Sequence, residues 1–224
     1  MRRCGRLMLL LLLFAAPAAA LAANEAVPVR PVALFGTREV FSADSSAFYK
    51  WHGVMRRFAA ERQDASCAGQ AAAACAPAEW RALVASLQGL DLRAKIERAN
   101  AAINRHPYVP SWVNWHESNY WETPYEFLRK GGQCQDYAVA KYLLLRAAGV
   151  SAERMRVVVL RDTRLGLDHA VTVAYVDGEA LLLDNLRRAV VPAASAPEYE
   201  PYYSINERGW WLHEGPHARY AALR

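Results

Sequence analysis

The chain has 224 residues, of which 54% are hydrophobic, so it is long enough to bury the core of one sizeable domain. Three of its 27 lysines and arginines lie within the first six residues, which leaves 24 basic against 22 acidic side chains, about +2, for the rest. No cluster of lysine or arginine marks a nucleic-acid groove, so we expect no nucleic-acid partner.

The beginning of the chain, residues 1–23, has the organisation of a secretory signal peptide. Three arginines precede an apolar run at 7–14, and small residues at 20–22 form a cleavage site. An uncleaved membrane anchor is the alternative, but about 15 apolar residues interrupted by Pro17 are short for a transmembrane helix. We therefore expect export to the periplasm and a mature chain, 24–224, without a membrane span.

The four cysteines divide into three groups. Cys4 leaves with the signal peptide, and Cys67 and Cys75 lie close together between two predicted helices. In an exported protein this pair favours a disulfide, worth about 2–3 kcal/mol for so short a loop. Cys134 is then left unpaired, and such a cysteine is either buried and inert or retained for its reactivity.

The first half of the mature chain predicts mainly helices. Residues 24–41 lack helical periodicity and read as extended. A helix from Asp44 or Ser45 to about Arg62 is indicated by four apolar side chains on one face: Phe48, Trp51, Met55 and Phe58. Two further helices are expected, one from Pro77 and one at about 91–104.

Residues 106–121 form an irregular, aromatic segment, which suits either the wall of a groove or an internally packed loop. Thr123, Pro124 and Glu126 then form a capping box that predicts the start of a short helix ending at two glycines. The next helix begins at Cys134 and ends near Gly149. Unpaired amides and the helix dipole at such a position favour a thiolate.

Strands follow at about 155–161, 168–176 and 179–185, and the last two are joined by Asp177-Gly178, a two-residue hairpin turn. The aromatic tail, 192–224, is expected to cover the sheet.

The hairpin turn fixes which residues of the two strands lie opposite each other. If Val176 pairs with Glu179, His169 and Asp184 become diagonal neighbours on one face. That face also carries apolar side chains, so we expect it to pack against the Cys134 helix: Val171, Val173, Tyr175, Ala180 and Leu182. Asp168 faces the opposite way.

Cys134, His169 and Asp184 are the residue types of a nucleophile, its base and the group that orients the base. A competing motif is the HExxH pattern that begins at His213. Zinc binding would need both of its histidines on one helical face, and the Gly215-Pro216 pair breaks such a helix.

At several positions the sequence resembles the bacterial transglutaminase-like cysteine proteinases, the LapG-type periplasmic proteases. The motifs that carry the resemblance are Gly131-Gly132-x-Cys134-x-Asp136-Tyr137-Ala138, the later His169 and Asp184-Asn185-Leu186, and the preceding Trp121-x-Thr123-Pro124. The similarity extends over about 41–211. It implies that Cys134 is the nucleophile, His169 the catalytic histidine and Asp184 its acid.

The resemblance also implies an α+β fold. Its papain/transglutaminase-like core has a nucleophile-bearing helix packed on an antiparallel sheet, with a helical N-terminal lobe at about 41–105 and a catalytic core at about 120–215. The implied substrate is a large exported adhesin whose cleavage regulates biofilm attachment. The implied partner is an inner-membrane cyclic di-GMP receptor with a periplasmic domain.

The sequence departs from the family beside the cysteine, where LapG-type enzymes carry acidic residues that help to bind calcium. Gln133 and Gln135 stand at two of these positions, and Asp136 is the retained acidic residue. Amides bring no charge to a hard cation. We therefore expect no required cofactor and, at most, weak calcium binding.

Two other functions remain open at this point. The same residues could perform transamidase or amidase chemistry, since the related fold supports both. A non-catalytic periplasmic binding module is the alternative from another class, and in it Cys134 would react as an ordinary thiol, independently of His169.

Overall fold

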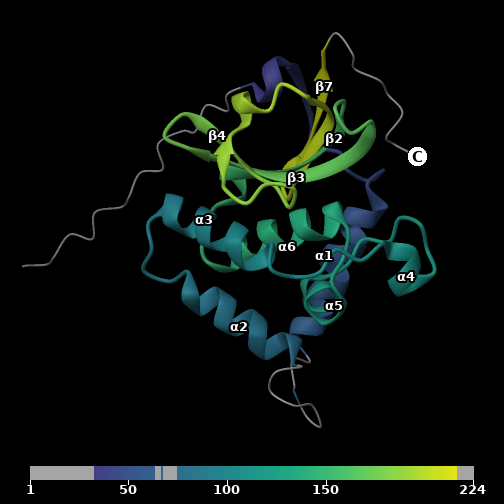
Figure 1. Cartoon of the computed structure of the whole chain (residues 1–224), viewed down its shortest axis with the longest axis vertical. Helices are drawn as coiled ribbons and strands as arrows, with labels where there is room; N and C mark the ends of the chain where they lie inside the picture. The colour runs from purple at the N-terminus through teal and green to yellow at the C-terminus, as the bar shows by residue number, and fades with distance from the viewer. Residues whose placement is uncertain (1–32, 64–66, 68–74, 216–224) are drawn as a thin grey trace, which may run out of the picture.

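The centre of the fold is helix α6 (Cys134–Ala147), which is buried along its length from Gln135 to Leu145. The computed structural model describes residues 33–63, 67 and 75–215. Within them α6 lies between an antiparallel sheet and the other helices (Figure 1). Because it is covered on all sides, its sequence is apolar nearly all round rather than striped.

The remaining α-helices lie around α6 on the same side of the sheet (Figure 1), and α3 (Leu92–Ile103), beside α6, contacts the sheet itself. Aromatic side chains join them, as in the pair Trp51 and Tyr142, whose ring centroids are 5.4 Å apart. Their bounds are α1 (Tyr49–Gln63), α2 (Ala76–Ser86), α3 (Leu92–Ile103), α4 (Ser111–Trp115) and α5 (Pro124–Lys130). The expected helices are confirmed. α1 begins later than predicted because Asp44 accepts the Ser46 N–H in a turn of its own (3.0 Å).

The sheet has seven strands in the order β1-β7-β6-β2-β3-β4-β5, and all the pairings are antiparallel. The strands are β1 (Arg38–Ser42), β2 (Met155–Asp162), β3 (Leu167–Val176), β4 (Glu179–Leu183), β5 (Val191–Pro192), β6 (Tyr199–Asn206) and β7 (Gly209–Glu214). Helices on one side and this sheet on the other give the expected α+β class.

The prediction that the C-terminal tail covers the sheet was wrong for most of the described tail, because it supplies β6 and β7, and β6 lies inside the sheet between β7 and β2. Pro201 makes β6 difficult to predict from the sequence. Proline cannot donate a hydrogen bond to a neighbouring strand, so its presence argues against a central strand. The structure accommodates it opposite Leu160, where the register between β2 and β6 shifts.

The predicted register of the β3–β4 hairpin is confirmed, with Val176 opposite Glu179 and Thr172 opposite Leu183. Asp177 and Gly178 both have positive φ, 51° and 82°, as the tight turn requires.

The face of the hairpin that α6 covers is not the one we expected. Small side chains at Ala170 and Ala174 meet the helix, and the Thr172 hydroxyl donates to the Ala138 carbonyl (2.7 Å). The larger side chains at 171, 173 and 175 enter a second apolar cluster on the other face, which Leu34 and Ala193 also join. Both faces are therefore buried, so an apolar pattern alone could not identify the one that the helix approaches.

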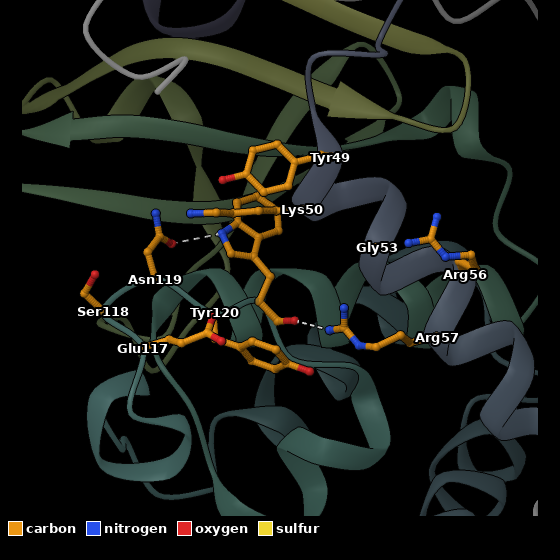
Figure 2. A pocket seen from close by; sticks show the side chains of 10 residues that line it. Tyr49, Lys50, Gly53, Arg56, Arg57, Glu117, Ser118, Asn119 and Tyr120 are labelled. Atoms are coloured by element: carbon orange, nitrogen blue, oxygen red, sulfur yellow. Dashed lines mark hydrogen bonds between the residues drawn. The ribbon is translucent and has the colours of Figure 1, made fainter.

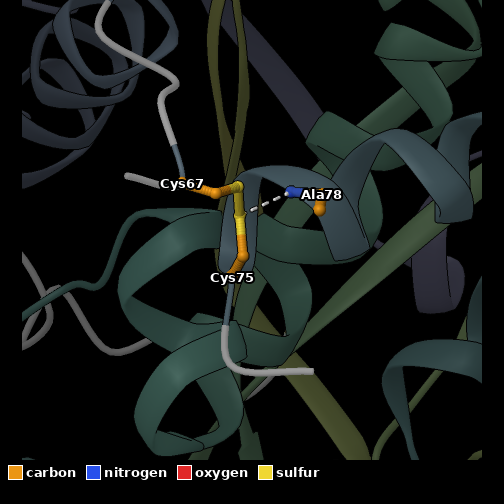
Figure 3. The surroundings of a disulfide bond; sticks show 3 residues. All are labelled: Cys67, Cys75 and Ala78. Atoms are coloured by element: carbon orange, nitrogen blue, oxygen red, sulfur yellow. Dashed lines mark hydrogen bonds between the residues drawn. A yellow bond between two sulfur atoms is a disulfide. The ribbon is translucent and has the colours of Figure 1, made fainter. Parts of the chain in front are cut away.

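The disulfide between Cys67 and Cys75 is formed, with the two Cα atoms 5.6 Å apart. The Cys75 sulfur also accepts the Ala78 N–H (3.3 Å), so the disulfide caps the start of α2 (Figure 3). Among the described residues Cys134 is the free cysteine, as predicted.

The expected signal peptide, 1–23, lies outside the described residues. Of the helices that the structure does describe, none combines the length and the apolar character needed to cross a bilayer.

Candidate active site

Two glycines shape the turn between α5 and α6. Gly131 has a left-handed φ of 72°, and a Cβ there would overlap the carbonyl oxygen of Pro107. A Cβ on Gly132 would lie 2.8 Å from the Asp136 carboxylate. Because neither position has room for a side chain, the chain can turn closely enough to place Cys134 at the first position of α6.

Asp136 holds this turn in place from inside the first turn of α6. Its carboxylate accepts the backbone N–H of Gln133 and that of Glu122, both at 2.8 Å. The side chain is 1% exposed. Burial and the nearby Glu122 charge raise the pKa of Asp136 well above its usual value. The carboxyl group therefore links the backbone just before Cys134 to the segment that contains Glu122.

The Cys134 sulfur is half-buried at the N-terminus of α6 and lies 3.5 Å from Oε1 of Gln135. The backbone N–H groups of Cys134 and Gln135 make no hydrogen bond with any other described residue. Both belong to the first helical turn, where N–H groups have no intrahelical acceptor and favour a nearby negative charge. They can therefore stabilise a thiolate or an oxyanion.

His169 and Asp184 form the second part of the site. Nε2 of His169 is 2.8 Å from Oδ1 of Asp184, and the side chains are 2% and 0% exposed. Asp184 is held in turn by the Tyr199 hydroxyl (2.6 Å) and the Leu186 N–H (2.9 Å). Burial favours a neutral carboxyl group, but the hydrogen bond from His169 outweighs it and lowers the pKa of Asp184.

The imidazole also lies next to Cys134, which helps to raise the pKa of the ring. Since Nε2 is taken by Asp184, Nδ1 is the ring nitrogen left for the sulfur. Burial opposes the charged ring, but the hydrogen bond with Asp184 and the neighbouring Cys134 outweigh it and raise the pKa of His169 to about 9. The three predicted residues thus lie in one chain of contacts, with the imidazole between the sulfur and the carboxylate.

The other acidic and histidine candidates lie elsewhere. Asp168 is exposed and pairs with Arg161 (3.0 Å) and the Tyr202 hydroxyl (2.8 Å). His213 is buried in β7 with its ring nitrogens against the hydroxyls of Thr37 and Ser204. Burial lowers its pKa to about 4, so it is a neutral structural residue. The second histidine of the HExxH pattern, His217, lies outside the described residues.

Sequence reasoning missed two residues that support Asp184. Tyr199 comes from β6, and Asn104, at the end of α3, donates to the Asp184 carbonyl (2.9 Å). No local sequence motif marks either residue, because each lies far from Asp184 in the sequence and reaches it only when β6 and α3 pack beside it.

Residues 63–213 match a family described as bacterial transglutaminase-like cysteine proteinases. The chain belongs to this family. It is therefore a cysteine peptidase, and the expected family and fold class are confirmed.

Solved structures of LapG from Legionella pneumophila resemble the chain at 28% identity. One has a TM-score of 0.59 and covers 70% of this chain and 86% of that one. An EGTA-treated form has a TM-score of 0.60, with 71% and 86% covered. A calcium-bound form has a TM-score of 0.59, with 70% and 86% covered. No curated protein matches the chain.

The side chains around Cys134 offer few free oxygens to a calcium ion, although Oε2 of Glu122 is buried without a hydrogen-bond partner among the described residues. The Gln133 amide nitrogen donates to the Ser111 hydroxyl (2.7 Å), and that of Gln135 donates to the Tyr120 carbonyl (3.1 Å). Both oxygens of Asp136 already accept backbone N–H groups. A hard cation needs several free, preferably charged oxygens. Here the amide N–H groups of Gln133 and Gln135 donate to oxygens of the segment at 111–120 instead. These hydrogen bonds hold the start of α6 against that segment.

Proposed function

We propose that the chain is a periplasmic cysteine endopeptidase that uses Cys134, His169 and Asp184 as its triad and cleaves a large exported adhesin. The observation that carries this proposal is the buried imidazole, which hydrogen-bonds to the Asp184 carboxylate and lies next to Cys134. Asp184 holds the ring in one orientation and stabilises its charged form. The ring in turn stabilises the Cys134 thiolate at the N-terminus of α6.

In the proposed reaction the Cys134 thiolate attacks the peptide carbonyl and forms a tetrahedral intermediate. The backbone N–H groups of Cys134 and Gln135 are free to donate to its oxyanion. His169 then gives its proton to the leaving amine, which departs as the thioester forms, and water hydrolyses the thioester with His169 as base.

The adhesin, the periplasmic location and the control of biofilm attachment are supported by the family and by the likeness to LapG. The signal-like residues 1–23 support export. In the same proposal, an inner-membrane cyclic di-GMP receptor holds the enzyme through its periplasmic domain and limits the cleavage.

The proposed function predicts the fate of the adhesin in cells. A strain that lacks this chain should retain a large repeat protein on its surface, and the wild-type chain should restore its release into the medium. Cys134→Ala should leave release at the background level, because the variant has no nucleophile. Immunoblotting of medium and cells measures this, and terminal sequencing of the released product locates the cleavage.

Expression of the variant at the wild-type level is the control. Release restored by Cys134→Ala would contradict the proposal. A product whose mass shows an added amine rather than water would indicate transamidation.

We also propose that the enzyme folds and acts without calcium, since the two glutamine amides occupy the turn. The melting temperature should differ by less than about 1 °C between excess calcium and a chelator, because an ion that does not bind the native state cannot stabilise it. In Gln133→Asp/Gln135→Glu the restored carboxylates should produce a calcium-dependent increase. A wild-type melting temperature that falls by several degrees on chelation would contradict this.

A further inference from the structure

A pocket of about 560 Å³ lies between α1 and the loop at 117–121 (Figure 2). Its α1 wall consists of residues at helical spacing, which places them on one face: Tyr49, Lys50, Gly53, Arg56 and Arg57. A Cβ on Gly53 would lie 3.3 Å from the Arg57 guanidinium, so the glycine leaves room at this wall. We refer to this cavity as the α1 pocket, and no residue of the proposed triad lines it.

Arg57 fixes the two walls of the α1 pocket to each other. Its guanidinium donates to the Trp121 carbonyl (2.5 Å) and lies 3.5 Å from the Glu126 carboxylate (Figure 2 shows the first contact). It also lies over the Tyr120 ring, 4.8 Å from the centroid. Because the Arg57 guanidinium is engaged by these contacts, it holds the two walls at a fixed separation and so defines the shape of the pocket.

The other two cations of the pocket are not used in this way. Within the described part of the chain, Lys50 and Arg56 make no hydrogen bond or ion pair. Lys50 does lie 5.8 Å from the centroid of the Tyr49 ring, and it interacts with the Glu117 charge at longer range. Glu117 is the one acidic side chain among the lining residues, so the lining carries more positive than negative charge.

Neutral donors complete the wall formed by the loop. Asn119 accepts the Trp121 indole N–H through its oxygen (3.2 Å), which leaves its amide N–H groups free, and Ser118 adds a hydroxyl (Figure 2). An ammonium, a guanidinium, an amide and a hydroxyl around one hollow form a donor set that suits carboxylates.

The loop wall of the α1 pocket is tied directly to the catalytic site. The Tyr120 carbonyl accepts both the Gln135 amide (3.1 Å) and the Ser111 hydroxyl (3.2 Å). Gln135 follows Cys134 and lies 3.5 Å from its sulfur. A polypeptide held in the pocket would therefore lie next to the segment that positions the nucleophile.

We infer that the α1 pocket binds an acidic segment of the polypeptide substrate, outside the residues that flank the cleaved bond. Charge complementarity supports this occupant, since the cations of the lining outnumber its one carboxylate, Glu117, and free N–H donors face a hollow large enough for side chains. The inference rests on the proposed function, because it takes a polypeptide as the substrate.

The test uses the full exported chain carrying Cys134→Ala and two fluorescein-labelled peptides of equal length, one with a run of glutamates and one with glutamines. Fluorescence anisotropy should show at least about fivefold tighter binding of the glutamate peptide, and this preference should weaken with salt. Lys50→Gln/Arg56→Gln should remove most of the preference. Arg62→Gln/Arg81→Gln removes the same charge from exposed sites that do not line the pocket, and it should keep the preference.

Equal affinity for the two peptides, including no detectable binding of either, would overturn the inference. An unchanged preference in Lys50→Gln/Arg56→Gln, with a wild-type circular dichroism spectrum, would also overturn it. Binding is measured without turnover, so a lack of peptidase activity in the wild-type chain would refute the proposed function and leave this result standing. If the chain did not prefer the glutamate peptide, the proposed roles of Cys134, His169 and Asp184 would be unaffected.

Discussion

Asp184→Asn should lower the peptidase kcat/KM by about 10³-fold or more, an effect typical of neutralising the acid of such a triad. Asp184 is one of the groups that raise the pKa of His169 to about 9. In the wild-type enzyme the imidazolium persists as the pH rises and is lost near pH 9. Without the carboxylate, burial favours the neutral ring, so the charged imidazolium should be lost at lower pH, and with it the charge that stabilises a thiolate on Cys134.

The rate of Cys134 alkylation by iodoacetamide as a function of pH measures this without a substrate. At pH 6.5 the variant should react about tenfold more slowly than wild type, because less thiolate is present. Asp168→Asn is the matched control, since Asp168 is exposed and pairs with Arg161 and Tyr202. Similar losses in both variants, or unchanged alkylation in Asp184→Asn, would contradict the assigned role.

Gly131→Ala should lower the free energy of unfolding by about 2–4 kcal/mol. The backbone of Gly131, with φ 72° and ψ 178°, lies in a region almost confined to glycine that costs an alanine roughly 1–3 kcal/mol, and overlap with backbone adds to this cost because backbone cannot move aside as a side chain can. The overlapping atom is the Pro107 carbonyl oxygen, whose neighbour Tyr108 forms a β-bridge with Gly132. Denaturant unfolding measures the loss, and the alkylation rate of Cys134 should fall as its loop shifts.

Gly149→Ala separates the cost of the backbone conformation from the cost of the steric overlap. Gly149 also has a positive φ, 88°, but a Cβ there would meet nothing within 4 Å. Its cost should therefore be the conformational part alone, roughly 1–2 kcal/mol, with no change in Cys134 reactivity. Equal destabilisation by the two substitutions would show that the contact with Pro107 adds nothing.

The sequence by itself determined the features that depend on near neighbours. The capping box at Thr123, the helix start at Cys134 and the pairing of Cys67 with Cys75 each follow from residues a few positions apart. The two-residue turn at 177–178 set the hairpin register, and with it the strand ends where His169 and Asp184 lie. Steric rules and hydrogen bonding act over these short distances, so local patterns suffice.

The tertiary structure decided what depends on contacts between distant segments. It placed β6 inside the sheet, between β7 and β2, despite Pro201, and it turned the small side chains of β3, rather than the large ones, toward α6. It also brought Tyr199 to Asp184 and connected the 117–121 loop to Gln135. A sheet buried on both faces gives the same apolar pattern whichever way it turns, so only the fit of complete layers selects the face that meets the nucleophile helix.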